Sequence, residues 1–65
     1  MQDKVNEVLK RVEFVSTIAE RYFENDNMRA YERKINQIDG MLDALSIFTG
    51  KKYILTEDNK VKEVG

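Results

Sequence analysis

The stretch that decides the fold is VNEVLKRVEFVSTIAERY, residues 5–22. Its apolar residues recur at alternating spacings of three and four, which is the heptad repeat of a helix that packs along another helix. The apolar seam formed by this repeat consists of Val5, Val8, Val12, Val15, Ala19 and Tyr22. We therefore predict an amphipathic helix over about residues 2–24.

The same repeat returns in MRAYERKINQIDGMLDAL, residues 28–45. Its seam consists of Met28, Tyr31, Ile35, Ile38, Leu42 and Leu45. The polar segment 24–27 separates the repeats, and Asp26 or Asn27 is suited to cap the second helix because a short side-chain oxygen accepts hydrogen bonds from free backbone N–H groups. Two matched seams and a short turn predict an antiparallel helical hairpin of coiled-coil type, with its second helix over about 27–49.

The pattern changes after Gly50, which is suited to end the second helix in a left-handed conformation. An aromatic and β-branched run, residues 53–56, and an alternating run, residues 61–64, flank a polar turn. This pattern predicts a short β-hairpin over about 52–64. Because an isolated two-stranded hairpin is marginally stable, we expect it to dock on the helices or to pair with a second chain.

The composition is that of one small, mainly α-helical domain spanning residues 1–65. The chain has no Cys and no His, which excludes disulfides and removes the commonest zinc ligand and general base. Its net charge of −1 lacks the strongly basic character of a nucleic-acid binder, and no apolar run is long enough for a membrane span. We expect a cytoplasmic protein that uses no cofactor and binds neither nucleic acid nor a membrane.

The apolar surface of the two helices is wider than a two-helix hairpin can bury. Five large apolar residues flank the seams: Leu9, Ile18, Phe23, Met41 and Phe48. Burial of such a side chain contributes about 1.5–3 kcal/mol, which is large beside the marginal core of so short a chain. We therefore expect a homodimer or higher oligomer, in which these residues pack two hairpins into a four-helix bundle.

Phe14 and Ile47 lie away from both seams. Either the C-terminal strands cover them, or they are exposed contacts for a partner protein, together with Tyr53 and Leu55. The leading hypothesis is a non-enzymatic, homo-oligomeric interaction module that regulates or inhibits a larger bacterial protein. Abundant Lys, Asn, Ile and Glu without Pro or Trp is typical of AT-rich bacterial and phage genomes.

The sequence Gly50-Lys51-Lys52 raises the alternative of a small anionic ligand such as a nucleotide. A phosphate-binding P-loop requires a strand before the glycine and a helix after it, and here the order is inverted. The alternative that the sequence leaves open is an oligomer that binds an anion without a P-loop. Its contacts would be Lys51, Lys52 and Tyr53, with Arg29 or Arg33 from a neighbouring subunit.

Carboxylates along one edge of the hairpin are the remaining candidates for chemistry. These are Glu13, Glu20, Glu32 and Asp39. Hard oxygen ligands of this kind suit Mg²⁺ or Mn²⁺, but the helical acid pairs here are four residues apart, not three apart as in the metal motif of all-α nucleotide pyrophosphatases. The serines and threonines have no His partner. We therefore predict no metal site and no enzymatic activity.

Overall fold

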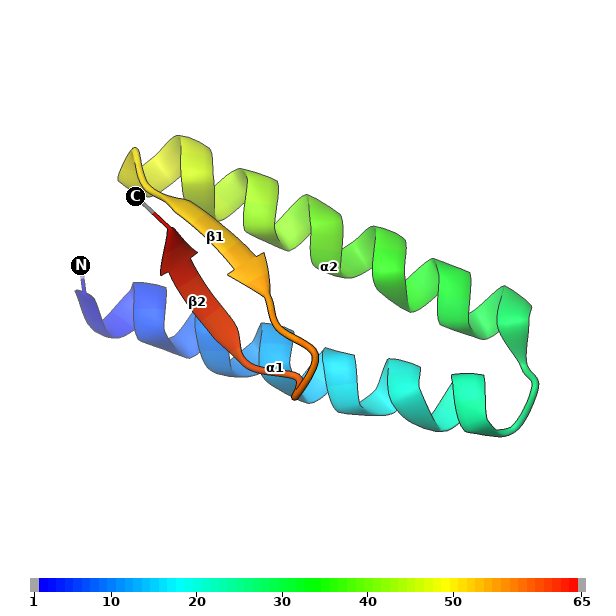
Figure 1. The fold of residues 1–65 in the computed structure, drawn as a ribbon. Helices are drawn as coiled ribbons and strands as arrows, with labels where there is room; N and C mark the ends of the chain where they lie inside the picture. The colour runs from blue at the N-terminus through cyan, green and yellow to red at the C-terminus, as the bar shows by residue number, and fades with distance from the viewer. Residues whose placement is uncertain (1, 65) are drawn as a thin grey trace.

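The computed structural model describes residues 2–64, and only the backbone of Gln2. Two long helices, α1 (Gln2–Glu24) and α2 (Met28–Thr49), are followed by strands β1 (Lys52–Leu55) and β2 (Val61–Val64). Figure 1 shows the helices running side by side, with the strands lying across the end where α1 begins and α2 ends. The predicted mainly helical hairpin with a short C-terminal β-hairpin is confirmed.

The core follows the predicted seams. Its buried apolar residues are Val5, Val12, Val15, Ala19, Ile38, Leu45 and Tyr53. All but Tyr53 are heptad positions, and Val12 at the centre of α1 has no exposed surface. The two seams therefore face each other, as the 3.6-residue helical period requires.

The turn between the helices is closed by backbone hydrogen bonds. Asp26 has a φ of 59°, and the Asn27 N–H donates to the Tyr22 carbonyl at 2.8 Å, the pattern of a Schellman motif. The Asn27 side chain then accepts a bond from the Ala30 N–H at 3.4 Å. Of the two residues predicted to cap α2, Asn27 is therefore the one that does so, while Asp26 ends α1.

Gly50 ends α2 as predicted, with a φ of 73° and an N–H that donates to the Ser46 carbonyl at 2.9 Å. The chain then reverses through β1 and β2, which pair antiparallel within the same chain. Lys52 is opposite Val64, and Leu55 is opposite Val61. The turn at 56–60 is closed by a bond from the Thr56 N–H to the Lys60 carbonyl at 2.7 Å.

The β-hairpin docks on the helices through apolar and polar contacts. Tyr53 is packed with Val5 and Leu45, and Leu55 and Val61 pack against the cluster around Val12. These contacts extend the seam core on one side of the helix pair. They meet the requirement that a two-stranded sheet be supported by other elements.

Three side chains of α1 complete this docking. The buried Ser16 hydroxyl donates to the Asn59 side-chain oxygen at 2.6 Å, and the Asn59 amide donates to the Glu20 carboxylate. The Val61 N–H donates to the Glu13 carboxylate at 2.9 Å. Two of the carboxylates considered as metal ligands therefore hold the β-hairpin in place.

Candidate protein-interaction surface

The β-hairpin covers only one of the two broad faces of the helix pair. Ser16 and Glu20, which bind the turn, lie on one side of the α1 seam. The heptad places positions 4, 11 and 18 on the other side of that seam, and positions 34, 41 and 48 beside them on α2. We define the sheet-free face as positions 4, 7, 11, 14, 18 and 21 of α1 with 30, 34, 37, 41, 44 and 48 of α2.

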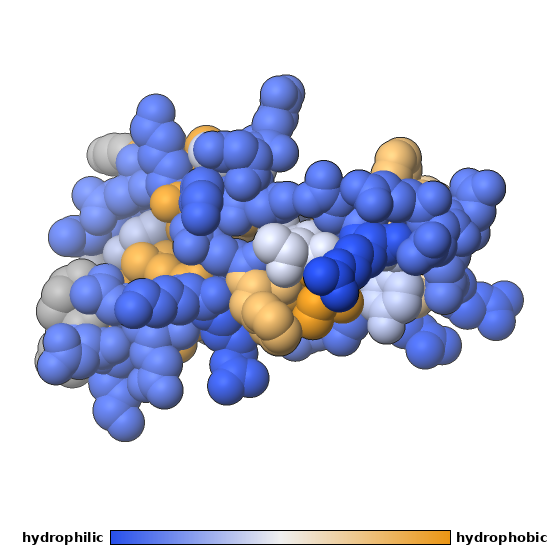
Figure 2. All heavy atoms as spheres, turned by 90° about the horizontal axis from the view of Figure 1, so that it is seen from below, coloured by the Kyte–Doolittle hydropathy of each residue, from blue (hydrophilic) through white to orange (hydrophobic). Residues whose placement is uncertain are grey.

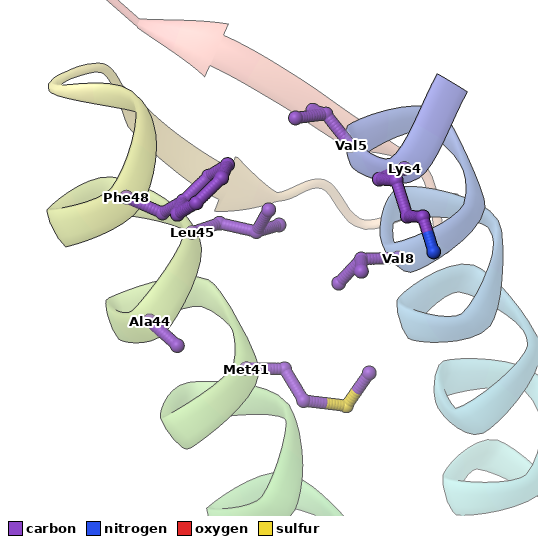
Figure 3. Close-up of a pocket in the computed structure, with 7 residues that line it drawn as sticks. All are labelled: Lys4, Val5, Val8, Met41, Ala44, Leu45 and Phe48. Carbon is purple, nitrogen blue, oxygen red and sulfur yellow. The ribbon is translucent and has the colours of Figure 1, made fainter. Parts of the chain in front are cut away.

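An apolar groove of about 420 Å³ lies on the sheet-free face. It is lined by Lys4, Val5, Val8, Met41, Ala44, Leu45 and Phe48. Figure 3 shows Met41 and Leu45 of α2 pointing toward Val8 of α1 across the groove. Lys4 is the only polar residue among those that line it, and no strand residue takes part. The groove is therefore a hollow between two helices, open on the side away from the sheet.

The predicted oligomer-interface residues divide between the two faces. Ile18, Met41 and Phe48 belong to the sheet-free face. Leu9 packs against the cluster that contains Tyr53, and Phe23 makes a tilted ring contact with Tyr31 at 5.2 Å on the sheet side. The five residues therefore do not form one continuous surface. Only Ile18, Met41 and Phe48 lie on the sheet-free face, which contains the groove.

The predicted partner contacts divide in a similar way. Phe14 and Ile47 remain 65% and 86% exposed, so the strands do not cover them. Tyr53 is only 9% exposed and Leu55 packs against the core, so neither presents a free side chain in this fold. Phe14 lies on the sheet-free face and Ile47 on the outer side of α2. Figure 2, which views the molecule from the α1 side, shows hydrophobic patches within a mostly hydrophilic surface.

Charge is segregated between the two faces of the helix pair. The sheet-free face carries four cations and one carboxylate: Lys4, Arg11, Arg21, Lys34 and Glu7. The helix positions that flank the seams on the sheet side carry five carboxylates and one cation: Glu13, Glu20, Glu32, Asp39, Asp43 and Arg29. A nearly neutral chain therefore presents an apolar groove on a basic face, whose cations Lys4, Arg11, Arg21 and Lys34 we call the basic rim, and an acidic flank on the other face.

The residues of the predicted anion site are not brought together within one chain. Lys51 Nζ lies 3.5 Å from Glu63 Oε1, so this cation already has a carboxylate partner. Arg29 and Arg33 lie near the start of α2 and Lys51 just beyond its end, about 30 Å away at 1.5 Å per residue. An anion site made from all of them would require a second chain, as the sequence already indicated.

No group of three or more Asp, Glu, His or Cys side chains among residues 2–64 is arranged to hold a metal ion. In the described part of the chain, neither helix combines the length and the hydropathy needed to cross a membrane. No protein-family model, curated protein or solved structure matches the chain. The function of the chain is therefore inferred from the geometry and charge of the sheet-free face.

Proposed function

We propose that this protein is a non-enzymatic protein-interaction module whose contact surface is the sheet-free face. The observation that supports this function is the apolar groove between α1 and α2, with Phe48 at its edge still 60% exposed. Exposed apolar surface of this kind on a small chain is typical of a docking site for another protein. We propose further that the chain regulates or inhibits a larger protein by covering part of that protein's surface.

A second copy of the chain is the other candidate occupant. Ile18, Met41 and Phe48 would be buried together if two hairpins met through their sheet-free faces, giving the four-helix bundle expected from the sequence. In a symmetric dimer of this type, however, the basic rim of one copy faces the same basic rim of the other. Like charges across an interface disfavour association, so we place a different protein first.

Site-specific photo-crosslinking tests both candidates. A photoreactive residue replaces Phe48 or Phe14 in the whole chain, and the matched control replaces Ile54, a partly exposed apolar residue of β1. In lysate from the native host, we expect positions 48 and 14 to yield an adduct with a larger protein and position 54 to yield none. An adduct of two copies alone would identify the homodimer. Equal or absent labelling at all three positions would contradict the proposal.

A further inference from the structure

The shape of the groove selects the kind of segment that fits it. Both walls are α-helices, whose backbone N–H and C=O groups are bonded within the helix. An extended peptide binds by adding to a free strand edge, and the strands β1 and β2 lie on the other face. A helix, in contrast, needs only an apolar groove for side chains spaced three and four residues apart. The groove therefore matches a helical segment.

The rim of the groove selects the charge of that helix. Lys4 lines the groove itself, and the helical repeat places Arg11 two turns further along α1 on the same face. Lys34 lies two turns from Met41 on the opposite wall. A helix lying along this path has cations on both sides of its apolar stripe, and Glu7, between Lys4 and Arg11 on α1, is the one carboxylate of this face. Acidic residues flanking that stripe are complementary to the rim, whereas a second copy of this chain brings cations to cations.

We infer that the sheet-free face binds an amphipathic helix of a partner protein, with an apolar stripe flanked by Asp or Glu. This inference rests on the proposed function, because it assumes that the sheet-free face is the contact surface. The apolar stripe of the partner helix enters the groove between Val8 and Met41. The carboxylates of that helix lie near Arg11 and Lys34, which fix its register and favour it over amphipathic helices with neutral or basic flanks.

The test uses two synthetic helical peptides of about 20 residues, long enough to span roughly 30 Å. Both carry the same apolar stripe, and its flanks are Glu in one peptide and Lys in the other. Binding of each labelled peptide to the whole protein is measured by fluorescence anisotropy at low and high salt. We expect the Glu peptide to bind about tenfold more tightly at low salt, with the difference shrinking as salt screens the rim.

Charge-reversal variants locate the effect. Arg11→Glu with Lys34→Glu should reverse the preference, so that the Lys peptide binds more tightly. Arg29→Glu makes the same change of sign on the sheet side of α2 and should leave the preference unchanged. Circular dichroism checks that each variant is folded. If the double reversal unfolds the chain, Arg11→Gln with Lys34→Gln is used, and it should abolish the preference.

Other outcomes would overturn the inference. Equal affinity for the two peptides would show that the rim does not select an acidic partner. Displacement of the Glu peptide by a DNA duplex at equal concentration would show a general polyanion surface. If neither peptide binds while position 48 still crosslinks to a larger protein, the acidic helix is wrong and the proposed function stands. If the crosslinks also fail, both are wrong.

Discussion

At the scale of single residues, the two described glycines have opposite requirements. Gly40 is inside α2, and a Cβ added there would meet no atom within 4 Å. A glycine inside a helix can mark a close contact with a neighbouring helix, and the structure has no such contact at Gly40. We expect Gly40→Ala to raise the free energy of unfolding by about 0.5–1 kcal/mol, because alanine loses less backbone entropy in a helix. Thermal unfolding of a chain this small should register this as several degrees.

Gly50 provides the control for this substitution. Its φ of 73° is a left-handed conformation in which a Cβ costs about 1–2 kcal/mol. Gly50→Ala should therefore lower the free energy of unfolding although a Cβ has open space there too. If both substitutions stabilised the chain, α2 would not end at Gly50 in the way described.

Asn59 is the residue that connects the turn of the β-hairpin to α1. Its φ of 63° is a conformation that Asn and Gly tolerate, and its side chain bonds to Ser16 and Glu20. Ser16→Ala should cost about 1–3 kcal/mol of unfolding free energy, because it leaves the Asn59 oxygen without its donor in a partly buried site. Asn59→Gly keeps the backbone conformation and removes both side-chain bonds.

A double-mutant cycle measured by urea unfolding tests whether this contact is formed. In the double variant, we expect a cost about 1 kcal/mol smaller than the sum of the two single costs, because the bond can be lost only once. Costs that add to within about 0.5 kcal/mol would show that Ser16 and Asn59 do not interact.

At the scale of elements, the helices and strands follow from local pattern, but the docking of the strands does not. Heptad spacing, Asn27 and Gly50 define the helix limits to within about a residue of those predicted. Which face the strands cover depends on Ser16 with Asn59 and Glu13 with Val61, pairs that are 43 and 48 residues apart. Both flanks of the seam contain large apolar residues, so periodicity could not choose between them. A serine at a flank position was the only signal.

The docking of the strands also decides whether Tyr53 is a core residue or a partner contact. It is packed with Val5 and Leu45, so Tyr53→Ala should lower the free energy of unfolding by about 3–5 kcal/mol, the usual cost of deleting a buried aromatic ring. Tyr53→Phe keeps the ring and should change it by less than about 0.5 kcal/mol. Urea unfolding measures both. A stable Tyr53→Ala variant that no longer crosslinks to the partner would instead return Tyr53 to the interaction surface.

At the scale of the whole molecule, the net charge of −1 conceals an uneven distribution of charge around the helix pair. The chain has 11 basic and 12 acidic residues, which read along the sequence as a balanced mixture. The heptad positions already put carboxylates along one edge of the helices, and the contacts of Asn59 with Ser16 and Glu20 place the sheet over this acidic side and leave the basic side free. The division matters because each face then favours a partner of opposite sign.

The two candidate occupants of the sheet-free face should therefore respond to salt in opposite directions. Raising NaCl from about 0.01 M to about 1 M shortens the Debye length from about 30 Å to about 3 Å. Screening removes repulsion between two basic rims, so self-association through this face should strengthen in sedimentation velocity. Screening also removes attraction between the rim and an acidic helix, so the Glu peptide should bind more weakly.

Arg11→Gln with Lys34→Gln should flatten both responses, which separates the effect of the rim charges from a general effect of salt on apolar contacts. Self-association that weakens with salt would contradict contact between like faces, because it requires the basic face of one copy to meet the acidic flank of the next.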